Sequence, residues 1–67
     1  MEQNNNLTKR EKEILLMIAK GYTTANISTA LEIAKGTVDT HLKNIHVKLN
    51  VNSRLQAVMK AIEIKAI

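Results

Sequence analysis

The sequence contains no cysteine, proline, phenylalanine or tryptophan, and it has only two glycines and one aromatic residue, Tyr22. Without cysteine, neither a disulfide framework nor a Cys-based metal site can support the fold. The core must therefore be built from aliphatic side chains and methionine. The absence of proline, together with many aliphatic residues at helical spacing, predicts an all-α domain.

Other absences argue against whole classes of function. No apolar run approaches the roughly 18 residues of a membrane span, and no signal peptide is present, so a cytoplasmic protein is expected. His41 and His46 lack acidic or cysteine companions at ligand spacing, which argues against a metal site. The sequence has no Gly-rich phosphate loop and no His–carboxylate–nucleophile set. We therefore expect no enzyme, no cofactor and no small-molecule ligand.

Length and charge suggest one small domain with a polyanionic partner. A chain of 67 residues is predicted to form a single domain. Residues 1–6 are mostly polar and have no apolar anchor, which predicts a disordered tail or linker remnant, so the folded domain is expected to span residues 7–67. The net charge of +4 suits a nucleic acid, although many domains carry such a charge for solubility alone.

Capping signals divide the first part of the chain into two helices. Thr8 and Glu11 form a capping box, and the helix that follows should end just before Gly21, a left-handed stop. Thr23 then predicts the N-cap of a second helix of about eight residues, with Asn26 as a poorer capping-box partner.

A tight turn at residues 32–34 leads into a long third helix, predicted over residues 35–49. Apolar residues at spacings of four, three and four share one face of it: Val38, Leu42, Ile45 and Leu49. The opposite face consists of small, polar and basic residues and one valine: Gly36, Thr40, Lys43, Asn44 and Val47. Such a helix, anchored on one side and polar on the other, can enter a DNA major groove, although an ordinary amphipathic surface helix has the same pattern. With the second helix it outlines a helix-turn-helix.

The fourth helix has two apolar faces. Asn50 should end the third helix in a left-handed conformation, and Asn52 or Ser53 should cap a helix over residues 54–65. The face expected to join the core carries Leu55, Val58, Met59 and Ile62. The roughly opposite face carries Ala57, Ala61 and Ile64. This second apolar face suggests contact with another subunit, unless the alanines serve only helix propensity. The residues expected to be largely buried in the domain are Leu15, Ile18, Ile27, Leu31, Val38, Leu42, Ile45, Leu49, Val51, Val58 and Ile62.

The order of these residues is similar to that of a known family. The matching positions are Leu7-Thr8-x-Arg10-Glu11-x-Glu13-Ile14-Leu15, Ile18-Ala19-x-Gly21-Tyr22-Thr23, Ile27, Leu31, Ile33, Thr37-Val38-x-x-His41-Leu42-x-Asn44-Ile45-x-x-Lys48-Leu49-x-Val51, Arg54 and Ala57-Val58. They resemble the LuxR/GerE/NarL-type DNA-binding domain over nearly the whole folded chain. The resemblance implies a four-helix domain of a bacterial transcription regulator, in which the third helix reads DNA and the fourth can mediate dimerisation. It also implies a receiver or sensor domain ahead of this one, or a stand-alone protein, with RNA polymerase as a further candidate partner.

The family reads bases from the start and middle of the third helix, which implies Asp39, Thr40 and Lys43 here. Lys43 can donate to guanine, and the Thr40 methyl group can touch a thymine methyl. Asp39 departs from the family's usual Lys or Arg; it can accept from a cytosine amino group, or pair with Lys35 or Lys43. The candidate phosphate contacts are Thr23, Thr24, Lys35, Gly36, Thr37 and Lys48.

The alternative is a helical protein-interaction module that does not bind DNA. It accounts for the second apolar face of the last helix and for the acidic Asp39. It does not account for a third helix that keeps a bare polar face with Gly36 at its tip. Phosphate binding must weaken steeply with salt, so salt-dependent retention on DNA or heparin separates the two hypotheses.

Overall fold

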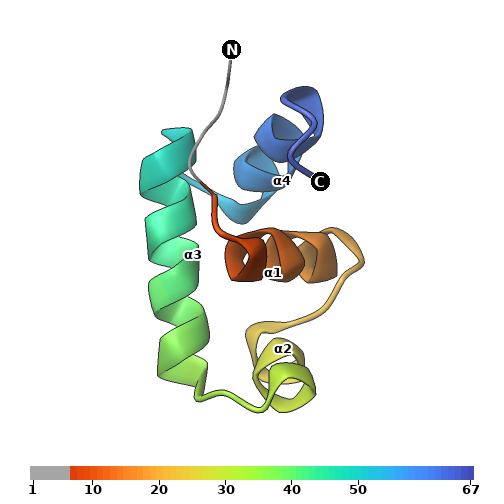
Figure 1. The fold of residues 1–67 in the computed structure, drawn as a ribbon, viewed down its shortest axis with the longest axis vertical. Coiled ribbons are helices and arrows are strands. Elements are labelled where there is room, and N and C mark those ends of the chain that lie inside the picture. The colour runs from red at the N-terminus through yellow and green to blue at the C-terminus, as the bar shows by residue number, and fades with distance from the viewer. Residues whose placement is uncertain (1–6) are drawn as a thin grey trace.

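The computed structural model describes residues 7–67, which form four α-helices and no strand (Figure 1). The helices are α1 (Lys9–Ala19), α2 (Thr24–Leu31), α3 (Lys35–Leu49) and α4 (Arg54–Glu63). The predicted all-α, four-helix architecture is confirmed. The fourth helix ends about two residues earlier than expected. The tail predicted for residues 1–6 lies outside the described residues.

Local capping sets the boundaries of α1 and α2. The Thr8 hydroxyl accepts from the Glu11 amide at 3.0 Å, and the Thr8 amide donates to Glu11 Oε1 at 2.9 Å. Gly21 has a φ of 95°, the left-handed conformation expected after α1. The Thr23 amide donates to Asn26 Oδ1 at 3.1 Å, and Thr23 Oγ1 accepts from the Asn26 amide at 3.0 Å. Asn26 therefore completes a capping box, as a Glu or Gln would.

The turn between α2 and α3 is held by side-chain and backbone contacts. Glu32 adopts a left-handed conformation with a φ of 56°, which reverses the chain after α2. The Ser28 hydroxyl donates to the Ile33 carbonyl at 2.6 Å. Ala34, at the N-cap of α3, offers no side-chain hydrogen bond, so α3 begins without the usual polar cap. At the other end, Asn50 stops α3 with a φ of 57°, as predicted.

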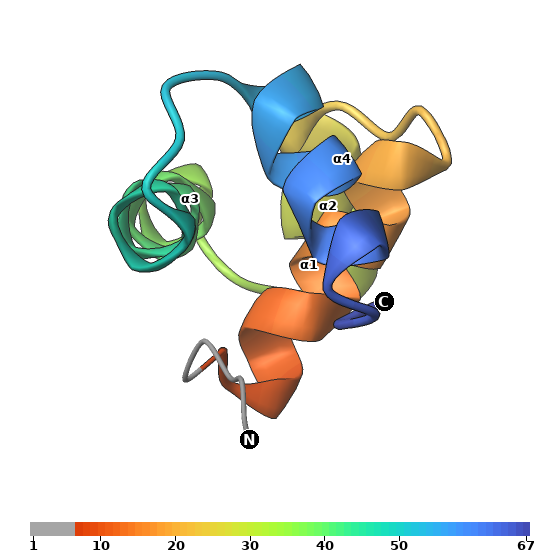
Figure 2. The ribbon, with the colours of Figure 1, turned by 90° about the horizontal axis from the view of Figure 1, so that it is seen from above.

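The helix α3 forms one side of the molecule, and the other three helices lie together on the other side of the molecule (Figures 1 and 2). It contacts all three of them, and α4 also packs on α1. The core lies between these helices and contains Leu7, Ile14, Leu15, Ile27, Val38, Leu42, Ile45, Leu49, Ala57 and Ala61. None of the described helices is long and apolar enough to cross a membrane. This arrangement leaves one side of α3 without a neighbouring helix.

The core prediction holds for α1, α2 and α3 but is wrong in part for α4. Most predicted core residues are buried, and Ile18, Leu31, Val51 and Val58 pack against the core while partly exposed. Ile62, in contrast, is 58% exposed. The outward orientation predicted for Ala57 and Ala61 is also wrong, because both have no exposed surface, and Ile64 packs against the same core.

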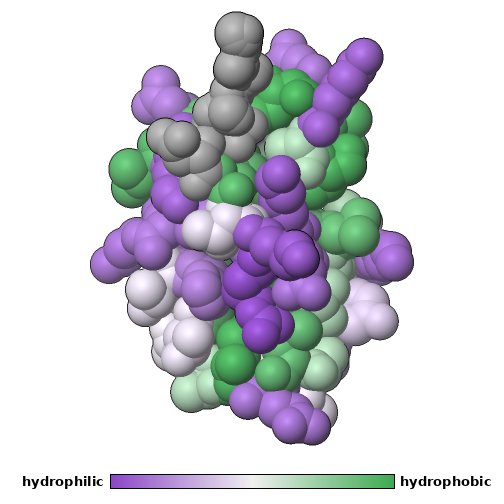
Figure 3. Space-filling model, in the orientation of Figure 1, coloured by the Kyte–Doolittle hydropathy of each residue, from purple (hydrophilic) through white to green (hydrophobic). Residues whose placement is uncertain are grey.

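Side-chain size explains why α4 turns its smaller apolar face inward. Alanines at the contact let α4 approach α1 and α3 closely, and close packing brings more atoms into van der Waals range. The larger apolar residues of α4 therefore remain at the surface: Leu55, Met59 and Ile62. Apolar side chains are visible over α4 in Figure 3. Ala57 and Ala61 therefore have no surface with which to contact a second subunit, contrary to the prediction. The exposed apolar face of α4 is formed by other residues.

Candidate nucleic-acid interface

The outward face of α3 is exposed along its length. Its members, predicted from periodicity, are all solvent-accessible: Gly36, Thr40, Lys43, Asn44 and Val47. Figures 1 and 2 show no other helix on this side of α3. Asp39 and Lys35 flank the same face and are exposed as well. The helix therefore presents a continuous surface on which a large ligand can lie.

The start of α3 is open to close approach. A Cβ atom added to Gly36 would meet no atom within 4 Å, and the residue sits in an ordinary helical conformation. Neither packing nor backbone geometry therefore requires a glycine there, although glycine costs helix stability. The Ala34 side chain caps none of the first amides of α3. Amides of this kind, at the positive end of the helix dipole, are suited to bind a phosphate.

The three predicted base-reading residues lie side by side on α3, but their polar groups are used differently. The Thr40 hydroxyl donates to the Gly36 carbonyl at 3.0 Å, which leaves its methyl group to contact a ligand. Within residues 7–67, no ion pair joins Asp39 to Lys35 or Lys43. The proposed pairing of Asp39 with a neighbouring lysine is therefore not formed here. Asp39, Lys43 and Arg54 line one shallow hollow.

Arg54 lies beside the candidate phosphate contacts of α2, a position that the sequence pattern does not predict. Its Nη2 donates to the Thr24 hydroxyl at 2.7 Å, so the start of α4 is tied to the start of α2. A cation in the first turn of a helix is disfavoured by the helix dipole. An arginine in such an unfavourable position indicates, from the sequence alone, that an anion or another partner lies nearby. The candidate phosphate contacts Thr23 and Thr24 begin α2, and Lys35 and Thr37 begin α3.

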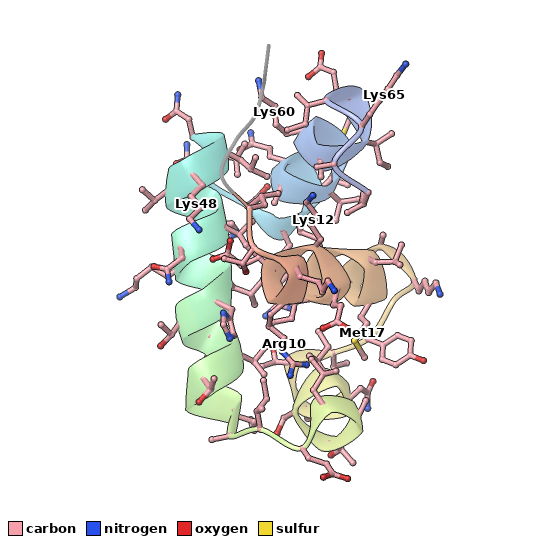
Figure 4. All side chains as sticks on the ribbon, in the orientation of Figure 1. Arg10, Lys12, Met17, Lys48, Lys60 and Lys65 are labelled. Carbon is pink, nitrogen blue, oxygen red and sulfur yellow. The ribbon has the colours of Figure 1, made fainter. Side chains whose placement is uncertain are left out.

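Lys48, a sixth candidate phosphate contact, is instead directed toward α1 (Figure 4). Its Nζ lies 2.8 Å from Glu11 Oε1, and the Glu11 side chain is only 3% exposed. Burial alone would raise the pKa of Glu11, but hydrogen bonds from Lys48 and the Thr8 amide, with the positive charge of Lys48, lower it below 4.5. Lys48 therefore joins two helices, and the phosphate contact predicted for it would have to compete with this ion pair.

The geometry as a whole defines a class of protein. Two helices joined by a tight turn, the second presenting a bare polar face, are packed on a supporting helix and a closing helix. This is the arrangement of a helix-turn-helix domain. Among residues 7–67, no group of three or more His, Cys, Asp or Glu side chains is placed to hold a metal ion.

Comparison with known proteins identifies the family. Residues 5–61 match the luxR family of bacterial regulatory proteins, also called GerE, and the chain belongs to this family. It is 53% identical over 57 residues to the response regulator protein VraR of Staphylococcus aureus, and equally to VraR of Staphylococcus epidermidis. Those matches cover 85% of this chain but 27% of the relatives, so the chain spans about a quarter of their length.

Two solved structures share the fold. The response regulator ChrA of a heme-sensing two-component system superimposes with a TM-score of 0.91 at 33% identity, covering 98% of this chain and 33% of ChrA. The transcription factor GerE superimposes with a TM-score of 0.86 at 35% identity, covering 94% of this chain and 92% of GerE. The chain is thus a helix-turn-helix DNA-binding domain of the kind found in bacterial transcription regulators.

Proposed function

We propose that this domain binds duplex DNA sequence-specifically, with α3 in the major groove, as the effector of a bacterial transcription regulator. The observation that carries the proposal is the uncovered outward face of α3, which begins at a glycine with open space around it. The parent protein would be a response regulator, as VraR and ChrA are named, or a stand-alone protein of the length of GerE. Either would act in the cytoplasm, where bacterial DNA lies.

Three residues of α3 would read bases. Lys43 would donate to guanine O6 or N7, which are acceptors at the floor of the groove. The Thr40 methyl group would pack on a thymine methyl, because its hydroxyl is already engaged by Gly36. Asp39, which pairs with no lysine within residues 7–67, would accept from a cytosine amino group.

The starts of α2 and α3 would bind the DNA backbone on either side of the base contacts. Thr23 and Thr24 offer hydroxyl groups, Lys35 and Thr37 flank the open amides of α3, and Gly36 allows the phosphate to approach. Helix N-termini favour phosphate through their free amides and dipole. We add Arg54 to this set, because it reaches the Thr24 hydroxyl and so lies beside the start of α2.

A binding selection on randomised duplexes tests the proposal. The wild type should return a consensus, and its affinity should fall steeply with salt. Lys43→Ala should lose about 1–3 kcal/mol of affinity for that consensus and flatten the preference at one base position. Lys35→Ala, the control, removes the same charge from a backbone contact and should weaken all sequences alike. A wild type that returns no consensus and binds heparin without salt dependence would favour the protein-interaction module.

We also propose that two copies bind DNA side by side through the exposed apolar face of α4. Leu55, Met59 and Ile62 supply the large apolar surface that a subunit contact needs, whereas Ala57 and Ala61 are enclosed in the core. Met59→Glu should abolish cooperative filling of a duplex with two half-sites and leave binding to one half-site unchanged. Ala19→Glu, an exposed change on α1, should leave cooperativity intact. Equal cooperativity in both variants would exclude this face as the interface.

A further inference from the structure

Val47 is the most exposed of the large apolar side chains in residues 7–67, with 75% of its surface accessible. It is separated from the buried Val38 by about two and a half helical turns, so the two side chains point in opposite directions. Valine is a weak helix former, because its branched Cβ restricts the side chain. Neither core packing nor helix propensity therefore accounts for a valine at this position.

A second apolar group lies on the same line of the helix. Thr40 and Val47 are about two turns apart, which places them on one side of α3 at an axial separation of about 10 Å. The Thr40 hydroxyl is engaged with the Gly36 carbonyl, so a methyl group is what this residue offers to a ligand. Between these two positions in the chain stands Lys43, exposed on the same face. Along the outward face of α3, an apolar group, a cation and a second apolar group therefore follow one another.

We infer that Val47 is a further specificity-determining residue, which contacts the C5 methyl group of a thymine. The inference rests on the proposed DNA-binding function and adds a residue and a base to it. The thymine methyl is the apolar group that base edges present in the major groove. An axial separation of about 10 Å corresponds to about three base-pair steps of about 3.4 Å. The half-site should therefore hold two thymine methyl groups about three base pairs apart, with the guanine bound by Lys43 between them.

Replacing single thymines by deoxyuridine tests this contact directly. Deoxyuridine lacks the C5 methyl group and keeps every base-pairing group, so only an apolar contact is removed. The duplex carries one half-site from the wild-type selection, and affinities are measured by fluorescence anisotropy. At one position the substitution should weaken the wild type about fourfold, the value of one buried methyl-sized group, and should not weaken Val47→Ala. At a second position, about three base pairs away, the loss should persist in Val47→Ala and vanish in Thr40→Ser.

Leu16→Ala is the control, because it truncates an exposed aliphatic side chain, 45% accessible, on α1 and away from both proposed contact surfaces. It should keep the wild-type sensitivity to deoxyuridine at both positions. If every deoxyuridine substitution lowers the affinity of the wild type and of Val47→Ala equally, the role proposed for Val47 is wrong. The same holds if the half-site has no thymines at this spacing. Base reading by Lys43 can still be correct in either case. If the wild type selects no half-site, the proposed function itself fails.

Discussion

Lys48 Nζ lies 2.8 Å from Glu11 Oε1 and joins the end of α3 to the start of α1 across 37 positions of sequence. The same oxygen accepts from the Thr8 amide at 2.9 Å, so one carboxylate both caps α1 and anchors α3. Among the buried residues of the range 7–67, Glu11 is the one that is charged or polar. A buried carboxylate is stable only when such partners compensate for its lost hydration.

Removing the ammonium should destabilise the fold in a pH-dependent way. We expect Lys48→Met to lower the free energy of unfolding by about 1–3 kcal/mol at pH 7, because a buried acceptor loses a charged donor. In the wild type the folded pKa of Glu11 lies below its ordinary value, so this stabilisation is present above pH 4.5 and is lost as the pH falls through the lowered pKa. The difference between variant and wild type, measured by urea denaturation, should therefore shrink at pH 3.

The exposed ion pair of Arg10 and Glu13, 3.3 Å apart on α1, is the control. Arg10→Met should cost at most about 0.5 kcal/mol, because solvent screens such a pair. A cost for Lys48→Met no larger than this would show that Glu11 does not depend on Lys48.

The phase of α3 and α4 can be checked with two isoleucines. Ile45 has no exposed surface, whereas Ile62 is mostly exposed. Ile45→Ala should cost about 2–5 kcal/mol, since it leaves a cavity between α3 and its neighbours. Ile62→Ala should change the stability by about 0.5 kcal/mol or less. Thermal melts of the two variants suffice, and similar losses in both would contradict the observed orientation of α4.

The helix boundaries were predictable from sequence because capping acts over three or four residues. Thr8 with Glu11, Gly21 and Asn50 each mark a helix end by local chemistry alone. The orientation of α4 was not predictable in this way. Both faces of that helix are apolar, and the choice depends on how closely α1 and α3 allow it to approach. The larger side chains gain more by burial individually, yet the two alanines fit the space.

Like the fold, the candidate interface was predictable from sequence only in part. Periodicity placed Thr40, Lys43 and Val47 on the outward face of α3, and all three are exposed. Periodicity says nothing about contacts between distant segments. The sequence pattern therefore does not predict that Lys48 reaches Glu11 or that Arg54 contacts Thr24.

The missing cap of α3 can be restored. Ala34→Ser should raise the stability by about 0.5–2 kcal/mol, because Ala34 already has the extended backbone conformation of an N-cap. Ser53→Ala should have the opposite effect, since the Ser53 hydroxyl accepts from the Gln56 amide at 3.2 Å. Denaturant unfolding of both variants measures whether each one gains or loses stability. If Ala34→Ser gives no gain, the first amides of α3 are satisfied by some other group.

Gly36→Ala separates folding from binding. The added methyl group meets open space, and alanine favours a helix over glycine, so the stability should stay unchanged or rise by up to about 1 kcal/mol. Affinity for the selected duplex should fall, because in the proposed complex the methyl group would stand where the DNA backbone approaches. Gly21→Ala is the control for stability: with a φ of 95° it should destabilise the fold. A Gly36→Ala domain that binds DNA as tightly as the wild type would show that no close approach occurs there.

Asp39 tests whether the outward face of α3 reads sequence at all. In the proposed complex, Asp39→Lys replaces a negative charge near the DNA backbone with a positive one, so non-specific affinity and its salt dependence should both rise. It also turns an acceptor into a donor at the groove edge, so the preferred base should change from one that donates to one that accepts, such as guanine. Asp39→Asn is the control, because it removes the charge and keeps a carbonyl acceptor; it should raise affinity less and alter the consensus less. Parallel selections with the three proteins measure both effects.

If all three return one consensus, Asp39 does not face the bases. If none returns a consensus, α3 is not a reading helix, and its exposed face is better explained as a surface for another protein.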